Sequence, residues 1–317
     1  MWAARRTAGS SAENAAQRSI VSTRPGGADS TGRAMGDVME EIDLSAGIIS
    51  YEDSGGEAPV VVLCHGLLMT ASLWDAVVAE LGPGFRCVRP TLPLGAHRHP
   101  MRPEADLSLR GQVRLLAEFL ERLDLHEVTL VFNDWSGAQP LVAEGWDGRV
   151  GRLVLASCET FDNYPPGLPG RVIALAAALP GGVAAALKPL RIKALRRLPM
   201  AFGLMSKRPI PDQLADEWLE PAMTQPAIRA DLRKYARGTR EGRRRMADAN
   251  SRLHGFGKPV LVVWAAEDKV MPLRSGRQLA ASFPDSRFVE IPDSRTLLPI
   301  DQPQALADTI AAFVSDR

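Results

Sequence analysis

Apolar positions along this chain follow two different periods. Segments with the length of one strand recur at residues 59–64, 85–90, 128–133, 152–157, 258–265 and 286–291, and those at 59–64, 128–133, 152–157 and 258–265 are mostly apolar. Two shorter segments at 40–44 and 48–52 precede these runs and predict a further pair of strands. Residues 107–123 and 302–313 instead carry apolar residues every three to four positions, which indicates amphipathic helices.

The predicted strands and helices alternate along most of the chain. Strands that are apolar along their whole length are typical of a parallel sheet covered on both faces. Right-handed connections between such strands give a doubly wound, mostly parallel sheet. We therefore predict an α/β fold in which functional groups gather at the carboxyl ends of the strands.

The alternation stops between residues 161 and 253. This segment begins near Tyr164 with a Pro/Gly-rich stretch, continues through an Ala/Leu-rich stretch, and carries a basic run at 188–197 before further helical patterns. We interpret the basic run as the solvated face of a helix, with contact to a membrane surface as the alternative. The segment predicts a helical insertion between two strands of the sheet.

The composition limits the functions that need to be considered. The 317 residues carry a formal net charge of +1 and are 45% hydrophobic, which fits one large domain, with or without an insertion. A near-neutral chain gives no reason to expect nucleic acid as a partner. No apolar run is long enough and free enough of charge to span a membrane. Residues 1–36 are rich in Ala, Arg, Ser and Gly without periodicity, and we predict that they are disordered.

The cysteines bear on the compartment and on metal binding. Cys64, Cys87 and Cys158 are odd in number and lack metal-ligand spacing. We therefore expect a reduced, cytoplasmic protein that uses neither a metal ion nor another cofactor.

The segment from Val128 to Ala138 is the most informative stretch of the chain. Its apolar strand breaks off at Asn133-Asp134, and small residues and a helical pattern follow. This order of strand, turn and helix is the context of a nucleophile elbow, which presents one side chain at the carboxyl end of a central strand. Asp134 occupies the tip, and the alternative is that its carboxylate only caps the following helix.

This segment resembles the elbow of α/β-hydrolase-fold enzymes, in particular haloalkane dehalogenases and epoxide hydrolases, in which an Asp nucleophile is followed by Trp. Asp134 and Trp135 match, whereas Gly137 falls one position late and Phe132 stands where the pattern has a small residue. The resemblance extends from about residue 40 to the C-terminus. It implies an α/β-hydrolase core at 37–160 and 254–317, with an inserted helical cap at 161–253 above the active site.

The resemblance also assigns roles outside the elbow. The loop that begins at His65 would supply the backbone N–H of Leu67, and the elbow that of Trp135, as the two donors of an oxyanion or halide site. His65 itself is either a substrate contact or a structural part of its loop. Asp268 takes the place of the catalytic acid, and Glu159 is the alternative, because some dehalogenases carry their acid there.

The catalytic His of these enzymes is missing from its usual place. The segment expected to read Pro-Asp-Ser-Gly-His reads Pro-Asp-Ser-Arg-Thr here, so Thr296 stands in the position of the His. An unactivated hydroxyl cannot serve as the base that directs water onto an ester, which leaves Thr296 as a substrate-binding candidate. His97 and His99 follow a strand at the correct edge and are candidate surrogate bases, with exposed loop residues as the alternative interpretation.

Three functions stay open at this point. The first is hydrolytic opening of an epoxide C–O bond or a C–halogen bond by Asp134, and Leu67 favours the epoxide because many dehalogenases have a halide-binding Asn in that position. The second is a non-hydrolytic acid–base enzyme, a lyase or isomerase. The third is a protein that binds a small molecule on an inactive hydrolase scaffold.

Two tyrosines of the insertion are candidates for binding the substrate. The resemblance places Tyr235 where epoxide hydrolases can have a cap Tyr that protonates the oxygen of an opening epoxide, with a surface packing residue as the alternative, and Tyr164 lies at the start of the insertion. The mostly apolar cap indicates a hydrophobic small molecule as substrate or ligand. The sequence does not predict an oligomeric state.

Overall fold

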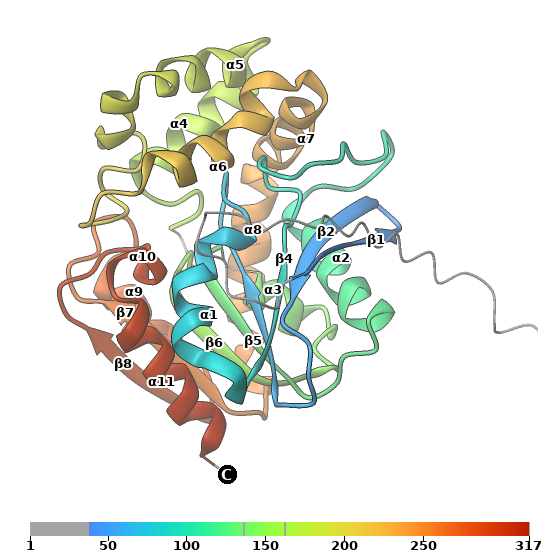
Figure 1. The fold of residues 1–317 in the computed structure, drawn as a ribbon, viewed down its shortest axis with the longest axis vertical. Helices are drawn as coiled ribbons and strands as arrows, with labels where there is room; N and C mark the ends of the chain where they lie inside the picture. The colour runs from blue at the N-terminus through green and yellow to red at the C-terminus, as the bar shows by residue number, and fades with distance from the viewer. Residues whose placement is uncertain (1–37, 136, 162, 317) are drawn as a thin grey trace, which may run out of the picture.

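A mostly parallel sheet of eight strands runs through the part of the protein that the computed structural model describes, residues 38–135, 137–161 and 163–316 (Figure 1). Its order is β1-β2-β4-β3-β5-β6-β7-β8. The strands are β1 (Val38–Leu44), β2 (Gly47–Asp53), β3 (Val60–Cys64), β4 (Arg86–Pro90), β5 (Val128–Asp134), β6 (Val150–Cys158), β7 (Val260–Ala265) and β8 (Ser286–Ile291).

Strand direction follows the predicted pattern. β1 pairs antiparallel with β2, and β2 with β4, while every pair from β4 to β8 is parallel. The predicted α/β fold with a mostly parallel sheet is therefore confirmed. Our prediction of disorder for residues 1–36 concerns positions outside the described residues.

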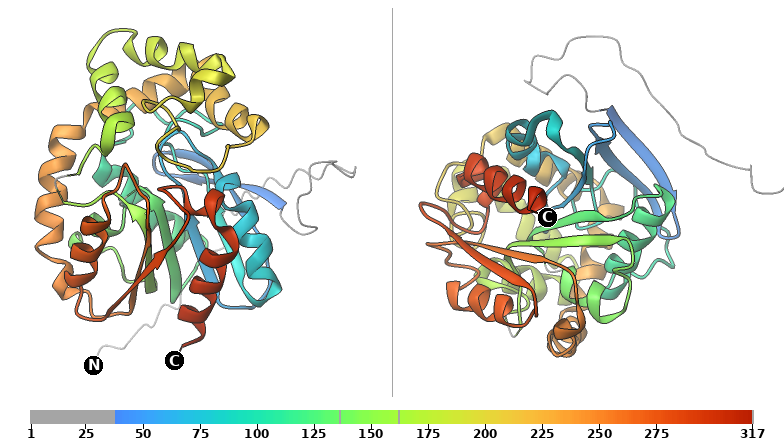
Figure 2. Two further views of the ribbon diagram at one scale, coloured as in Figure 1. Left: turned by 90° about the vertical axis from the view of Figure 1, so that its left-hand side faces the viewer. Right: turned by 90° about the horizontal axis from the view of Figure 1, so that it is seen from below.

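Helices cover both faces of the sheet, which explains why β5 is buried at every position. α1 (Asp75–Leu81) and α11 (Pro303–Ser315) pack together on one face (Figure 2). The other face is covered by α2 (Leu109–Arg122), α3 (Ala138–Ala143) and α9 (Leu273–Ala281). None of the described helices is both long and apolar enough to cross a membrane.

A group of helices lies between β6 and β7 in the sequence. They are α4 (Gly167–Ala178), α5 (Gly182–Leu187), the short 3-10 helices η3 (Lys188–Arg191) and η4 (Lys193–Arg197), α6 (Asp212–Thr224), α7 (Pro226–Arg237) and α8 (Thr239–Asn250). α4 to α7 lie over the carboxyl end of the sheet, and we call residues 163–237 the cap (Figure 1). α8 instead runs down beside the sheet and packs against α3.

The carboxyl ends of the parallel strands meet beneath the cap. Parallel pairing of β3, β5, β6 and β7 brings the loops that follow these strands to one edge of the sheet. Leu67, Asp134, Glu159 and Asp268 follow or end these strands. The candidate site is built at this edge.

Candidate active site

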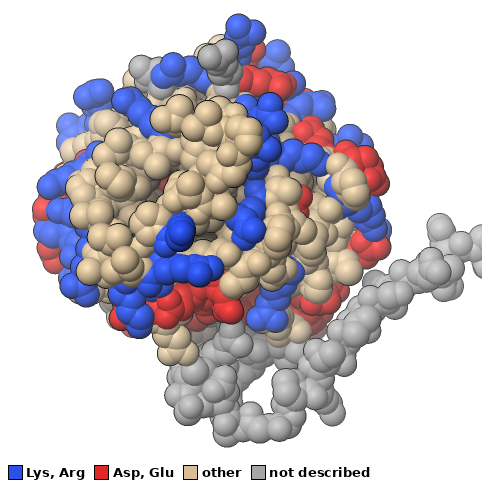
Figure 3. All heavy atoms as spheres, turned by 90° about the horizontal axis from the view of Figure 1, so that it is seen from above, with Lys and Arg blue, Asp and Glu red and all other residues tan. Residues whose placement is uncertain are grey.

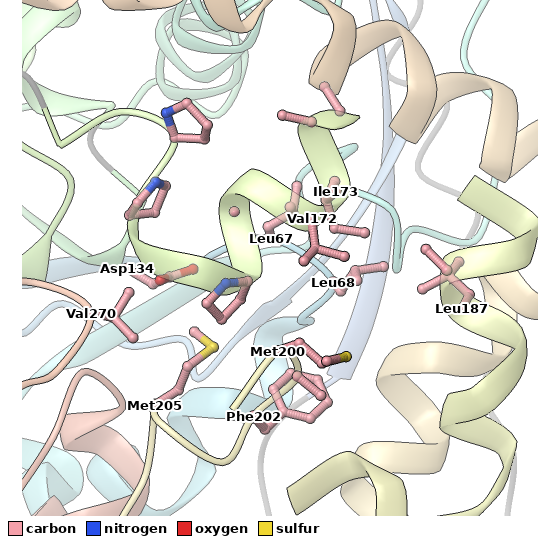
Figure 4. Close-up of a pocket in the computed structure, with 18 of the residues that line it drawn as sticks. Leu67, Leu68, Asp134, Val172, Ile173, Leu187, Met200, Phe202, Met205 and Val270 are labelled. Atoms are coloured by element: carbon pink, nitrogen blue, oxygen red, sulfur yellow. The ribbon is translucent and has the colours of Figure 1, made fainter. Parts of the chain in front are cut away.

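Asp134 lies at a sharp turn of the backbone. It is the last residue of β5, and its φ of +64° is a conformation that residues other than Gly rarely adopt. The pairing of β5 with β6 shifts by one residue between Asn133 and Asp134. Backbone strain of this kind is concentrated at functional sites, where surrounding structure holds it in place. The turn directs the Asp134 side chain into a cavity below the cap (Figure 4).

The large residue Phe132 and the late glycine Gly137, the two departures of this elbow from the pattern that it resembles, compensate each other. The rings of Phe132 and Trp135 pack with their centroids 5.7 Å apart. A Cβ atom at Gly137 would come within 2.6 Å of the Trp135 ring and 2.7 Å of the Phe132 ring. The displaced glycine thus makes room for the large residue on β5.

The carboxyl group of Asp134 is held by the loop after β3. The backbone N–H of Leu67 donates a hydrogen bond to it, and a Cβ atom at Gly66 would overlap its Oδ2. The backbone N–H of Trp135 instead donates to the carbonyl oxygen of Asn133 at 2.7 Å. Of the two backbone N–H donors expected from the resemblance, that of Leu67 contacts the Asp134 carboxyl group, whereas that of Trp135 is used by a hydrogen bond within the elbow.

Burial sets the protonation state of Asp134. The pKa of this carboxyl is raised to about 7, chiefly by loss of solvent and to a smaller extent by the neighbouring charge of Asp268, against the lowering effect of the Leu67 hydrogen bond. Burial also raises the pKa of Asp268 to about 6. Two buried carboxyl groups therefore interact electrostatically, and near neutral pH each holds its proton for part of the time.

Thr296, which stands in the sequence where the resemblance places a His, is hydrogen-bonded to Asp268. Its Oγ1 donates to Oδ1 of Asp268 at 2.8 Å, and the backbone N–H groups of Val270 and Met271 donate to the same oxygen at 2.9 and 2.8 Å. The other oxygen, Oδ2 of Asp268, is buried and makes no regular hydrogen bond with any described residue. Hydrogen bonds to Asp268 are therefore concentrated on Oδ1, and the side chain of Ser157 also interacts with this carboxyl group.

The cavity below the cap has a volume of about 150 Å³ and a mostly apolar lining. Cap residues such as Ile173, Leu187 and Phe202 face Asp134 across it (Figure 4). The polar side chains in the lining are those of Asp134, Glu159, Tyr164, Tyr235 and Thr239. Such a lining suits a small apolar molecule with one or two polar atoms.

Tyr164 and Tyr235 form a pair of phenols in this cavity. Their hydroxyl oxygens are 3.4 Å apart, and burial, followed by nearby charge that includes Glu159, raises the pKa of both hydroxyls well above its usual range. Both therefore stay protonated at any ordinary pH and can donate a proton or a hydrogen bond. The indole N–H of Trp135 interacts with Tyr235 but makes no regular hydrogen bond with a described residue, so a further donor is available.

Glu159 stands beside Asp134 at the end of β6. Its backbone N–H donates to the Asp134 carbonyl at 3.2 Å, and its own carbonyl accepts a hydrogen bond from Nε2 of Gln139 at 2.9 Å. Its side chain is buried and lines the cavity. The structure thus brings both acid candidates close to Asp134, with only Glu159 in the cavity lining.

Comparison with known proteins agrees with this geometry. Residues 61–309 match the model of the alpha/beta hydrolase family. The chain belongs to this family. It is 26% identical over 283 residues to haloalkane dehalogenase 2 of Mycobacterium tuberculosis, which covers 87% of this chain and 93% of that protein. A haloalkane dehalogenase of Mesorhizobium japonicum is 31% identical over 98 residues, a match that spans 31% of either chain.

A solved structure shares the fold of this alpha/beta hydrolase. An ancestral haloalkane dehalogenase superposes with a TM-score of 0.71 at 20% identity, covering 87% of this chain and 98% of the other. At this identity the likeness establishes the architecture alone.

His65 of this alpha/beta hydrolase has a structural environment. Its Nδ1 donates to the Gly66 carbonyl at 2.8 Å, and its Nε2 accepts from the Leu92 N–H at 2.9 Å. Burial lowers its pKa to about 4, which keeps the ring neutral. His65 does not line the cavity. It shapes the loop that carries Leu67.

His97 and His99 do not reach the cavity either. His97 accepts a hydrogen bond from the Gly95 N–H at 3.3 Å, and its Nε2 lies 3.2 Å from Oδ2 of Asp231 on α7. His99 pairs at the surface with Glu41 at 2.7 Å. Both rings are engaged away from Asp134, so the structure does not bring either candidate base to the site.

Two buried amides position the site and were not picked out from the sequence. Nδ2 of Asn133 donates to the carbonyl oxygens of Ala156 and Thr296, at 2.9 and 2.7 Å, and so fixes the loop that carries Thr296. Gln139 holds Glu159 as described above. In the sequence, these two residues could have been found as amide side chains beside the elbow, at positions where an apolar residue would pack. Among the described residues, no group of three or more His, Cys, Asp and Glu is arranged to hold a metal ion.

Proposed function

We propose that this alpha/beta hydrolase opens the epoxide ring of a small apolar molecule with Asp134 as nucleophile. The observation that carries the proposal is the Tyr164–Tyr235 pair, whose hydroxyls lie 3.4 Å apart in the same cavity as Asp134. A carboxylate that attacks carbon and phenols that protonate the released oxygen are what ring opening requires.

The first step needs no histidine. A carboxylate oxygen of Asp134 forms a bond to one ring carbon, the carbon–oxygen bond breaks, and the oxygen takes the proton of Tyr235. The product is a 2-hydroxyalkyl ester of Asp134, with the Tyr235 phenolate stabilised by the hydroxyl of Tyr164. Hydrolysis of the ester by water gives a diol, restores the carboxylate and returns a proton to Tyr235.

The second step is the slow one in this proposal. Thr296 cannot activate water, and no imidazole of the described residues lines the cavity. Asp268 and Glu159 are the remaining bases, but Asp268 does not line the cavity, and a Glu carboxylate is ordinarily a weaker base than imidazole. Absence of a positioned base costs about a hundred- to ten-thousand-fold in the step that it serves, so the ester is expected to accumulate.

Intact-mass measurement tests this sequence of steps. The protein is incubated with a panel of apolar epoxides and haloalkanes, the latter because the indole N–H of Trp135, which makes no regular hydrogen bond with a described residue, also suits a departing halide. We expect an adduct on Asp134 that Asp134→Asn lacks, and faster release of the adduct in Thr296→His. An adduct on another residue, or neither adduct nor diol across the panel, would reject the proposal.

The raised pKa of Asp134 supports a second candidate, a non-hydrolytic acid–base enzyme. A carboxyl group that titrates near pH 7 can both take and return a proton in one cycle. Such an enzyme would exchange a substrate hydrogen for deuterium in heavy water without forming an adduct. Stabilisation by apolar ligands with neither exchange nor adduct would indicate a binding protein instead.

A further inference from the structure

The outer face of the cap is unusually apolar for a solvent-exposed surface. Leu175 on α4 is 69% exposed and Ile192, between η3 and η4, is 60% exposed. Of the large apolar side chains exposed among the described residues, all except Ile48 belong to the cap, and they are Leu168, Leu175, Leu179, Ile192, Leu198 and Met200. We call these six residues the apolar cap face.

Positive charge borders this face, without negative charge on the same segment. Residues 163–211 contain eight Lys and Arg and no Asp or Glu. Arg171, Lys188, Arg191 and Arg197 are exposed and form no ion pair with any described residue. Figure 3 looks onto this side and shows an uncharged surface bordered mostly by Lys and Arg, with Asp and Glu at parts of its edge.

The cavity reaches the same face. Leu198 and Met200 are both 40% or more exposed and also line the cavity with Asp134. α4 contributes to both sides, because Val172 and Ile173 line the cavity while Leu175 faces outward. A molecule that arrives at the apolar cap face therefore meets apolar side chains continuously from the surface to the cavity.

We propose that the apolar cap face docks on the surface of an anionic lipid bilayer. Exposed leucines and isoleucine would enter the boundary between headgroups and acyl chains, while the unpaired cations contact anionic headgroups. A second copy of the chain fits less well, because a symmetric contact would bring the two basic borders together. The proposal deepens the proposed function, since it makes lipid-dissolved apolar epoxides the substrate source.

Vesicle co-sedimentation of the full-length protein tests the docking surface. We expect binding to vesicles of phosphatidylcholine with phosphatidylglycerol, weaker binding at high salt, and little binding to phosphatidylcholine alone. Removal of three cations, in Arg171→Gln/Arg191→Gln/Arg197→Gln, should weaken binding roughly tenfold or more. The apolar variant Leu175→Ser/Ile192→Ser should lose binding to a similar extent.

Matched changes elsewhere serve as controls. Arg114→Gln/Arg122→Gln/Arg274→Gln removes three exposed cations from α2 and α9, and Ile48→Ser removes the exposed apolar residue outside the cap. Both should bind like the unchanged protein. Asp134→Asn should also bind to the vesicles like the unchanged protein. Vesicle binding therefore tests the docking surface even if the proposed epoxide opening by Asp134 is wrong.

Three results would overturn the docking proposal. The first is absence of binding to anionic vesicles. The second is binding that neither cap variant weakens, which would assign it to another region such as the Arg-rich residues 1–36. The third is a dimer in sedimentation analysis that Leu175→Ser/Ile192→Ser dissociates, which would make a second copy the occupant of this face.

Discussion

A carboxyl group must lose its proton before it can attack carbon, and the burial of Asp134 opposes that loss. The pKa of this group is raised to about 7, so only part of the protein carries the reactive form at neutral pH. At the scale of the single residue, the pH and the atomic contacts around the Asp134 side chain therefore set the fraction of this carboxyl group that is ionised.

The first prediction is that the rate of adduct formation on Asp134 depends on pH. The ionised fraction rises through the pKa, so the rate should increase with pH up to about 7 and level off above it, with a loss of about tenfold per unit well below it. Single-turnover mass measurements between acidic and alkaline pH would check this. A rate that is flat across the range would argue against attack by the Asp134 carboxylate.

A second prediction concerns Gly66, whose missing side chain leaves space for the Asp134 carboxyl group. A Cβ atom there would overlap Oδ2, so Gly66→Ala must displace the Asp134 carboxyl group, the proposed nucleophile. Displacement by about 1 Å can cost about a hundredfold in rate, and we expect adduct formation to fall to that extent.

The control for this change is Gly148→Ala, because a Cβ atom at Gly148 meets no described atom within 4 Å. Circular dichroism should show an intact fold in both variants. Full activity of Gly66→Ala would mean that the carboxyl group is not held as the structure has it.

At the scale of the element, the strands were the most predictable part of the chain. β8, the partly buried edge strand, spans 286–291 as predicted. β7 begins two residues later than expected; it is buried at every position, and such a parallel strand leaves a continuous apolar run in the sequence. The predicted helix at 107–123 is α2 (Leu109–Arg122), whose start is fixed by the side chain of Ser108 accepting a hydrogen bond from the Gly111 N–H.

The arrangement of the site was less predictable, for a physical reason. Asp134 and Glu159 could be placed because each ends a strand at the same edge of the sheet. The contacts of His97 with Asp231 and of Thr296 with Asp268 join residues far apart in sequence, and no local pattern encodes such pairs. The packing of α8 against α3 was not predicted for the same reason. An amphipathic pattern predicts that one face of a helix is buried, but it does not indicate which element covers that face.

A third prediction follows from the contact between α7 and the loop after β4. Oδ2 of Asp231 accepts a hydrogen bond from the Met101 N–H at 2.9 Å and lies 3.2 Å from Nε2 of His97. Asp231→Ala leaves these buried donors unpaired, so it should lower the free energy of unfolding by about 2–3 kcal/mol. Because α7 carries Tyr235, epoxide opening should also decline.

Urea unfolding would measure the loss, with Asp248→Ala on the exposed side of α8 as the comparison. That control should change stability by less than about 0.5 kcal/mol. Equal stability of Asp231→Ala and the unchanged protein would show that this contact does not anchor α7.

At the scale of the whole molecule, the buried carboxyl group links stability to pH. The pKa of Asp134 is raised on folding, so the folded protein keeps a proton that the unfolded chain has already lost between about pH 4 and pH 7. Stability from this group is complete below the unfolded pKa and is lost as the pH rises through about 7. The site therefore destabilises the fold most at the pH at which the proposed nucleophile, the Asp134 carboxylate, is fully ionised.

The fourth prediction is that Asp134→Asn stabilises the protein at pH 8. Asn cannot ionise, so the variant should gain roughly 1–4 kcal/mol over the unchanged protein at that pH, since each pKa unit corresponds to about 1.4 kcal/mol. The gain should shrink toward pH 5. Unfolding curves at the two pH values provide the measurement, and a variant less stable than the unchanged protein at pH 8 would refute the linkage.

The way Gly66 and Leu67 hold the Asp134 carboxyl group also has a stereochemical consequence. The attacking carboxylate is held against one loop, and the two phenols that would protonate the epoxide oxygen lie on the side of the cap. The attacking group and the proton donors therefore have fixed relative positions in a chiral site. Mirror-image epoxides cannot place both the attacked carbon and the ring oxygen equally well in it. A racemic epoxide should therefore alkylate the protein through one enantiomer first, and chiral chromatography of the unreacted epoxide would reveal the other in excess; an unreacted fraction that stays racemic would show that the cavity leaves the substrate free to turn.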